Sequence, residues 1–101
     1  MSDHLLIIED DDALRAQLHR RLAGRGFNVS SAASAAATHA LLKQLSALDA
    51  VLLDQNLGQD NGLDLIAPIL ARFPRCRIVM HTGYGSIPAA VAATRRGASD
   101  Y

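Results

Sequence analysis

Apolar residues gather in short unbroken runs along this chain, and each run ends in polar or charged residues. Three such runs occupy residues 5–8, 50–53 and 78–80. A short continuous apolar run bounded by turn signals is typical of a strand buried on both faces, as in a parallel sheet covered by helices. We therefore predict buried strands over residues 5–8, 50–54 and 77–81.

The stretches between these runs carry the signals of helices and of one more exposed strand. Residues 27–31 alternate apolar and polar, which predicts a strand with one solvated face. Apolar residues at helical spacing, with polar caps before them and glycine or proline after, predict helices that begin near Asp11 or Asp12, at Ser34, near Leu63 and at Ser86. The apolar positions of the first two are Leu14, Leu18 and Leu22, then Ala37, Ala40, Leu41, Leu42 and Leu45, while Arg15, Arg20 and Arg21 are expected on a solvated face.

Pro68 conflicts with the third of these helices, predicted over residues 63–73. A proline inside a helix removes the amide that would bond to the carbonyl of Asp64. We therefore expect a kink in this helix or a late start, with Pro74 closing it.

Strands alternate with helices along the whole chain. This order predicts an α/β fold, a doubly wound parallel sheet with right-handed crossovers and helices on both faces. At 101 residues the chain is expected to form one domain, residues 1–101. Residues 98–101 have the pattern of the opening of a fifth strand, and the sequence ends there.

The amino-acid composition restricts the partners and the cellular compartment expected for this chain. The ten basic and ten acidic residues cancel, so nothing favours a phosphate backbone or an anionic membrane, and we expect no direct nucleic acid binding. No apolar run approaches the roughly 20 residues of a membrane span. The single cysteine, Cys76, excludes an internal disulfide, which fits a reducing compartment. We interpret the chain as a cytoplasmic domain and Cys76 as a buried packing residue.

Polar groups capable of chemistry follow each predicted buried strand. The acids 9–12 follow the first strand, Asp54 ends the second, and Thr82 follows the third. In open α/β sheets ligands bind outside the carboxyl ends of the strands, so these groups are expected at one edge. Carboxylates at hydrogen-bonding range repel, and either protons or a bound cation relieve the repulsion. Oxygen ligands alone favour Mg²⁺, and an aspartate can itself become an aspartyl phosphate.

The same residues carry a resemblance to a known family. The segments are Ile7-Ile8-Glu9-Asp10-Asp11, Leu52-Leu53-Asp54-Gln55-Asn56, Asn61-Gly62-Leu63, Met80-His81-Thr82-Gly83 and Gly97-Ala98-Ser99-Asp100-Tyr101. In this order and spacing the chain resembles the receiver domain of bacterial two-component response regulators over nearly its whole length. The resemblance implies a flavodoxin-like receiver fold and a phosphoacceptor role in signal transduction.

Carried over position by position, the resemblance implies a role for each residue of the site. Asp54 matches the aspartate that a sensor histidine kinase phosphorylates and that also serves as a metal ligand. Glu9 and Asp10 match the acidic pair that holds Mg²⁺, Asp10 directly and Glu9 more often through water. Asn56 matches the position whose backbone carbonyl completes the metal site.

Three further positions match the parts of a receiver that respond to phosphorylation. Thr82 matches the switch hydroxyl, and Tyr101 matches the switch aromatic that moves between exposed and buried rotamers. The amide of Gly83 would help to hold the phosphoryl group. The partners implied are a sensor histidine kinase, an output domain or downstream partner outside this chain, and a second copy of the chain.

The chain departs from the receiver pattern after Tyr101. A lysine and a fifth helix are expected there, and the sequence ends before both. We interpret the chain as C-terminally incomplete, truncated in the fifth strand and lacking the fifth helix. Segments 82–87 and 97–101 resemble receivers attached to DNA-binding transcriptional outputs, including activators of the redox-responsive and nitrogen-regulatory kinds.

Other functions compete with this interpretation. A receiver-like domain that is not phosphorylated would act as a protein interaction module, which the missing lysine favours and the retained acids oppose. A dinucleotide-binding loop at Gly83 lacks its third glycine, since Pro88 stands there. A haloacid-dehalogenase-type phosphatase wants an acid where Asn56 stands. We expect no enzyme beyond self-catalysed phosphorylation and dephosphorylation, and packing or surface roles for His19, His39 and His81.

Overall fold

The computed structural model of the chain describes residues 3–81 and 96–99. The predictions for Thr82, Gly83 and Tyr101, and the helix expected from Ser86, lie outside the described residues. The elements in chain order are β1 (His4–Ile8), α1 (Asp12–Gly24), β2 (Asn28–Ala32), α2 (Ala35–Gln44), β3 (Ala50–Asp54), β4 (Asn56–Leu57), β5 (Asp60–Asn61), a 3-10 turn (Gly62–Leu65), α3 (Ile66–Arg72) and β6 (Arg77–His81).

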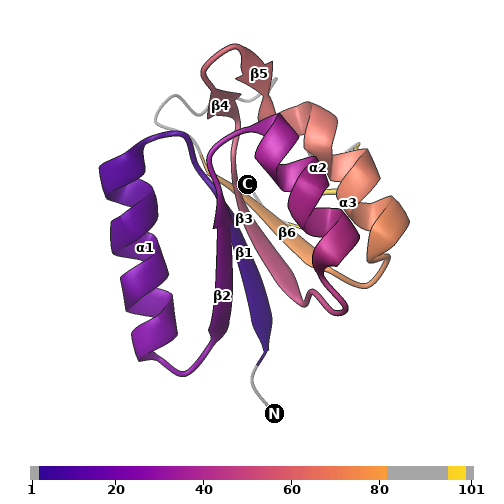
Figure 1. The fold of residues 1–101 in the computed structure, drawn as a ribbon. Coiled ribbons are helices and arrows are strands. Elements are labelled where there is room, and N and C mark those ends of the chain that lie inside the picture. Colours follow the sequence, from indigo (N-terminus) through magenta and orange to yellow (C-terminus); the bar gives the residue numbers. More distant parts are fainter. Residues whose placement is uncertain (1–2, 82–95, 100–101) are drawn as a thin grey trace.

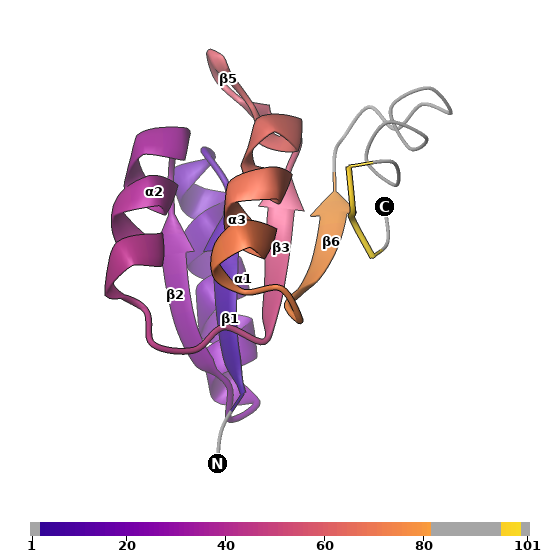
Figure 2. The same ribbon diagram turned by 90° about the vertical axis from the view of Figure 1, so that its right-hand side faces the viewer.

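Four parallel strands form the central sheet, in the order β2-β1-β3-β6. Helix α1 covers one face of the sheet, and α2 and α3 cover the other (Figure 1). Figure 2 shows α2 and α3 in front of the sheet and α1 behind it. The chain starts at β1, moves outward to β2, returns to β3 and continues to β6. This is the doubly wound parallel sheet predicted from the sequence, with the strand order of flavodoxin-like folds.

The main core lies between the sheet and the helices α2 and α3. Alternate residues of β1, β3 and β6 are fully buried there: Leu6, Ile8, Val51, Leu53, Ile78 and Met80. Cys76 is buried beside them, as predicted, and burial together with the nearby Asp49 raises the pKa of its thiol to about 11. A thiol with this pKa stays protonated at neutral pH, so Cys76 packs and does not act as a nucleophile.

The opposite face of the sheet is more open than the unbroken apolar runs predicted. Val79 is 38% exposed, and β6 alternates between buried and more exposed positions. Among the described elements only α1 lies on that face, and it packs against β1 and β2, away from β6. Leu14 in α1 is itself 36% exposed. The prediction of burial on both faces is therefore wrong for β6.

Helix α2 begins where the sequence predicted. Ser34 is its N-cap, and the Ser34 hydroxyl accepts a hydrogen bond from the amide of Ala37 at 3.1 Å. The buried stripe differs from the prediction, because Ala40 is exposed and Thr38 is fully buried. The Thr38 hydroxyl donates to the Ser34 carbonyl at 2.9 Å, so the helix itself satisfies the buried polar group.

The conflict at Pro68 is resolved by a late start of the third helix. The chain first forms the 3-10 turn, and α3 begins only at Ile66. Pro68 thus falls in the first turn of α3, where a missing amide costs least. No helix in the described part of the chain is long and apolar enough to cross a membrane.

Residues 96–99 lie beside β6 (Figure 2). The amide of Ser99 donates to the carbonyl of Ile78 at 2.8 Å, and the amide of Ile78 donates to the Ser99 hydroxyl at 3.2 Å. Arg96 forms an ion pair with Asp64 at 2.8 Å. The segment therefore follows the free edge of β6, where the sequence predicted the opening of a fifth strand.

Replacing Ser34 with alanine removes the cap of α2. We expect Ser34→Ala to lower the free energy of unfolding by about 1 kcal/mol, because the Ala37 amide loses its acceptor. Ser34→Asp keeps an acceptor and should retain most of the stability. Ser46→Ala, at an exposed loop position, is the matched control. Urea denaturation measures the three variants, and equal stability of the two alanine variants would contradict the capping role.

Candidate functional site

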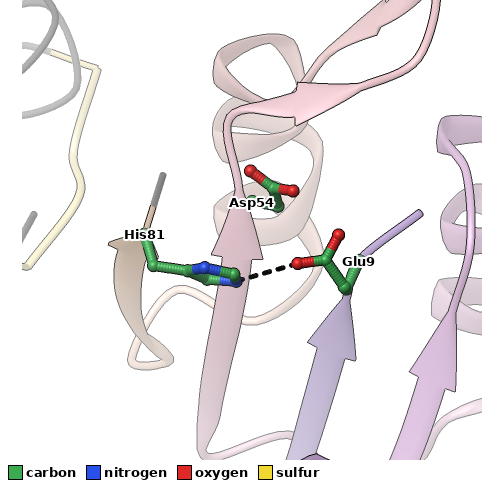
Figure 3. A group of neighbouring side chains, drawn as sticks. All are labelled: Glu9, Asp54 and His81. Carbon is green, nitrogen blue, oxygen red and sulfur yellow. Dashed lines mark ion pairs between the residues drawn. The ribbon is translucent and has the colours of Figure 1, made fainter. Parts of the chain in front are cut away.

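Three polar side chains stand at the same level on three adjacent strands. The pairing of β3 with β6 places Asp54 opposite His81. The pairing of β1 with β3 places Ile8 opposite Leu53, so that Glu9 follows at the level of Asp54. Because residues in register point to the same face of a sheet, Glu9, Asp54 and His81 converge (Figure 3). Their candidate ligand atoms all lie within 4.8 Å of one another.

Glu9 is fixed by the first turn of α1. Its carboxylate oxygen Oε2 accepts a hydrogen bond from the Asp11 amide at 3.1 Å, and its carbonyl accepts from the Arg15 guanidinium at 2.9 Å. Asp11 is also the N-cap of α1, because its side chain accepts from the Leu14 amide at 3.0 Å. Glu9 is only 2% exposed, so the start of the helix holds a buried carboxylate in place.

Arg15 differs from its predicted role on a solvated face. Its guanidinium bridges the Glu9 carbonyl and the carboxylate of Asp12, which it reaches at 2.7 Å. The Arg15 side chain is consequently only 21% exposed, whereas Arg20 and Arg21 are exposed as predicted. Arg15 is a positioning residue for the backbone of the site.

Asp54 ends the central strand β3 and is 9% exposed. Its Oδ1 atom accepts a hydrogen bond from the Asn56 amide at 3.1 Å, which orients the carboxylate. The hairpin of β4 and β5 then brings the chain back, and the Gly62 amide donates to the Gln55 carbonyl at 2.7 Å. A Cβ atom at Gly62 would overlap the Asp54 carbonyl oxygen. Glycine is therefore required where the chain returns.

Asp10 and Asn56 stand at the rim of the same site. Together with Glu9, Asp54 and His81 they line one open hollow at the carboxyl edge of the sheet. Asp10 is exposed, whereas Glu9 and Asp54 are buried. The four residues for which the sequence predicted a metal thus lie together. Their oxygen donors fit Mg²⁺, which takes one or two carboxylates and retains several waters.

The carboxylates of this site act on one another electrostatically. Burial is the largest cause of a pKa of about 7 for Glu9; the Asp11 amide opposes the rise, and the Asp54 and Asp10 carboxylates add to it. Close to pH 7 the Glu9 carboxyl is therefore about half protonated. A cation bound between the carboxylates would relieve the same repulsion.

His81 is the residue of the site that the sequence analysis missed. The ring extends from the end of β6 towards Glu9 (Figure 3), and its Nε2 atom lies 3.8 Å from Glu9 Oε1. Nε2 is buried and has no hydrogen-bond partner among the residues that the structure describes. The signal available in the sequence was the register, since His81 ends its strand as Asp54 ends the neighbouring one.

Comparison with known proteins shows the family of the chain. The profile of the response regulator receiver domain matches residues 5–101. The chain is 39% identical over 97 residues to the photosynthetic apparatus regulatory protein RegA of Rhodobacter capsulatus, covering 96% of this chain and 52% of that protein. It is 42% identical over 97 residues to the acid tolerance regulatory protein ActR of Sinorhizobium medicae, covering 96% of this chain and 50% of that protein. The chain thus spans about half the length of these relatives.

A solved structure of a response regulator is also similar to this chain. It is a response regulator protein from Burkholderia pseudomallei with a phosphorylated aspartic acid, a calcium ion and citrate. The similarity has a TM-score of 0.94 at 35% sequence identity, and it covers 99% of this chain and 58% of that one.

Glu9→Gln tests the raised pKa of this carboxyl. The carboxyl titrates near 4.5 when unfolded and near 7 when folded, so between these values the folded state keeps a proton that the unfolded state has lost. Stability therefore falls as the pH rises through this interval, by at most about 3 kcal/mol, and is constant above it. Because glutamine does not titrate, we expect the stability of Glu9→Gln not to fall over this pH interval. Urea unfolding with a chelator between about pH 5 and 8 measures the difference from the wild type, and a difference independent of pH would count against the shift.

Gly62→Ala tests the return of the chain onto Asp54. The new Cβ meets backbone atoms of Asp54 and Gln55, which cannot move without shifting β3, so we expect a loss of about 2 kcal/mol or more. Gly24→Ala is the control, because no atom lies within 4 Å of a Cβ there. It should be neutral or stabilising by up to about 1 kcal/mol. Thermal unfolding compares the two, and similar midpoints would show that the loop relaxes freely.

Proposed function

Because this chain belongs to the response regulator receiver domain family, we propose that Asp54 accepts a phosphoryl group from a sensor histidine kinase. The observation that carries the proposal is the place of Asp54. Its carboxylate ends the central strand beside the buried Glu9, in an open hollow that Asp10 also lines. The phosphorylated aspartic acid in the similar Burkholderia pseudomallei structure supports the same role.

The chemistry asked of Asp54 is a nucleophilic substitution at phosphorus. One of its carboxylate oxygens attacks the phosphorus of a phosphohistidine, the phosphorus–nitrogen bond breaks, and the leaving imidazole takes the electron pair and a proton. Such a transfer depends mainly on positioning and on neutralising charge. The Asn56 amide supplies positioning through its hydrogen bond to Asp54 Oδ1.

The oxygens around Asp54 would hold Mg²⁺. We assign Asp10, Asp54 and the backbone carbonyl of Asn56 as ligands, with Glu9 acting more often through water. When bound, Mg²⁺ neutralises charge on the carboxylates and on the transferring phosphoryl group. Without a cation, protonation of Glu9 relieves part of the same repulsion, as its raised pKa indicates.

The response to phosphorylation is assigned to residues outside the described part of the chain. The Thr82 hydroxyl would bond to the phosphoryl oxygens, the Gly83 amide would help to hold them, and Tyr101 would change rotamer as Thr82 moves. These roles follow from the family alone.

The change would be read by a partner beyond this chain. An output domain or a second copy of the chain is the proposed partner. The chain spans about half of the regulatory proteins RegA and ActR, and a DNA-binding output is favoured by the resemblance of segments 82–87 and 97–101 to receivers attached to such outputs. The domain itself is proposed to bind no nucleic acid. It would catalyse no reaction other than its own phosphorylation and dephosphorylation.

Intact mass after incubation with acetyl phosphate and Mg²⁺ tests the proposal. We expect one added phosphoryl group on the wild type and on Asp64→Asn, a control that removes an exposed carboxylate. We expect none on Asp54→Asn, and none on the wild type when a chelator removes Mg²⁺. Labelling that persists in Asp54→Asn would assign the acceptor elsewhere. No labelling of the folded wild type would favour the interaction module that acts without phosphorylation.

A further inference from the structure

The imidazole of His81 has no part in the phosphoacceptor role proposed above. That role uses oxygen ligands, whereas His81 brings a nitrogen to the same place from the end of β6 (Figure 3). The Nε2 atom is buried and lacks a hydrogen-bond partner among the described residues. Leaving a buried polar atom unsatisfied costs free energy, so a ligand that uses this atom is favoured.

We propose that Glu9, Asp54 and His81 form a site for Zn²⁺. Zinc takes imidazole nitrogen and carboxylate oxygen, while Mg²⁺ takes oxygen almost exclusively. The buried Nε2 atom of His81 therefore gives the site a preference for zinc over Mg²⁺, which the carboxylates alone would not give. The set is of the open kind, in which three protein ligands leave a fourth position for water.

The distances suit the small coordination sphere of zinc. Bonds of about 2.0–2.1 Å in a tetrahedron place neighbouring ligand atoms roughly 3.4 Å apart. His81 Nε2 and Glu9 Oε1 are 3.8 Å apart, and the ligand atoms of all three residues lie within 4.8 Å of one another. Rotation of the carboxylate side chains can bring the three ligand atoms to the spacing that zinc requires, because the strands already hold the three residues in register.

Zinc in this position would share ligands with Mg²⁺. Both ions would use the Asp54 carboxylate directly, and Mg²⁺ would also occupy the space beside Glu9 with its water, so the binding of the two ions is mutually exclusive. A zinc ion on Asp54 would also occupy the carboxylate that accepts the phosphoryl group. This second consequence rests on the proposed function, whereas the binding of zinc does not.

Calorimetric titration of the metal-free protein with Zn²⁺ alone tests the site. We expect one tight equivalent for the wild type, and an affinity at least about tenfold lower for His81→Asn. His39→Asn is the matched control, because it removes an exposed histidine on α2 and should leave the affinity within about twofold of the wild type. The ratio of Zn²⁺ to Mg²⁺ affinity should fall with His81→Asn, since only zinc uses the nitrogen.

Nitrogen-15 NMR of the histidine rings gives a second measurement on the unaltered wild-type protein. The Nε2 resonance of His81, assigned by its absence in His81→Asn, should shift on adding one equivalent of Zn²⁺, while the resonances of His39 stay in place. An unshifted His81 resonance would overturn the proposal, and so would equal zinc affinity in the wild type and His81→Asn. Equal losses in His81→Asn and His39→Asn would show scattered surface binding and would overturn it as well.

The two proposals fail in different experiments. Labelling by acetyl phosphate depends on Asp54 and Mg²⁺, whereas zinc titration involves no phosphoryl donor. A chain that binds zinc but is not labelled would retain the zinc site and lose the phosphoacceptor role. A chain that is labelled but does not bind zinc would retain the phosphoacceptor role and lose the zinc site.

Discussion

The parallel register of β1, β3 and β6 is the constraint on which the site depends. It sets Glu9, Asp54 and His81 at one level on neighbouring strands, so that their side chains must share one small volume. Two buried carboxylates at this distance repel, and each has lost the water that would stabilise its charge. The fold compensates with backbone amides, from Asp11 to Glu9 and from Asn56 to Asp54. The negative charge that these hydrogen bonds do not offset can bind a proton or a cation, and Asp54 can accept a phosphoryl group.

The packed core beneath the site supports this arrangement. On the face towards α2 and α3, alternate apolar residues of β1, β3 and β6 are fully buried, so moving the ends of these strands apart would disturb the packing of the core. The loops add their own restraints: Arg15 bonds to the Glu9 carbonyl, and Gly62 packs on the backbone of Asp54. A proton or a bound cation can relieve the repulsion between the carboxylates without moving the strands apart.

The imidazole of His81 changes which ions such a site prefers. The oxygens of Glu9, Asp10 and Asp54 suit a hard cation that keeps its waters, whereas a nitrogen at the same edge suits a metal that binds closely and loses them. Both kinds of ion would use the carboxylates of Glu9 and Asp54. A receiver with this residue at the end of β6 would therefore connect the supply of a transition metal to the availability of its phosphoacceptor.

The sequence by itself determined the alternation of strands and helices, and hence the doubly wound sheet, because unbroken apolar runs and helical spacing are local signals. It also placed the acids and Asp54 at the ends of strands, which brought the predicted metal residues to one edge. Only the tertiary structure decided that His81 enters the site, that Arg15 turns inward to Glu9 and that Val79 stays exposed. Strand register and the placement of α1 over β1 and β2 decide these points, and both arise from contacts between residues distant in the chain.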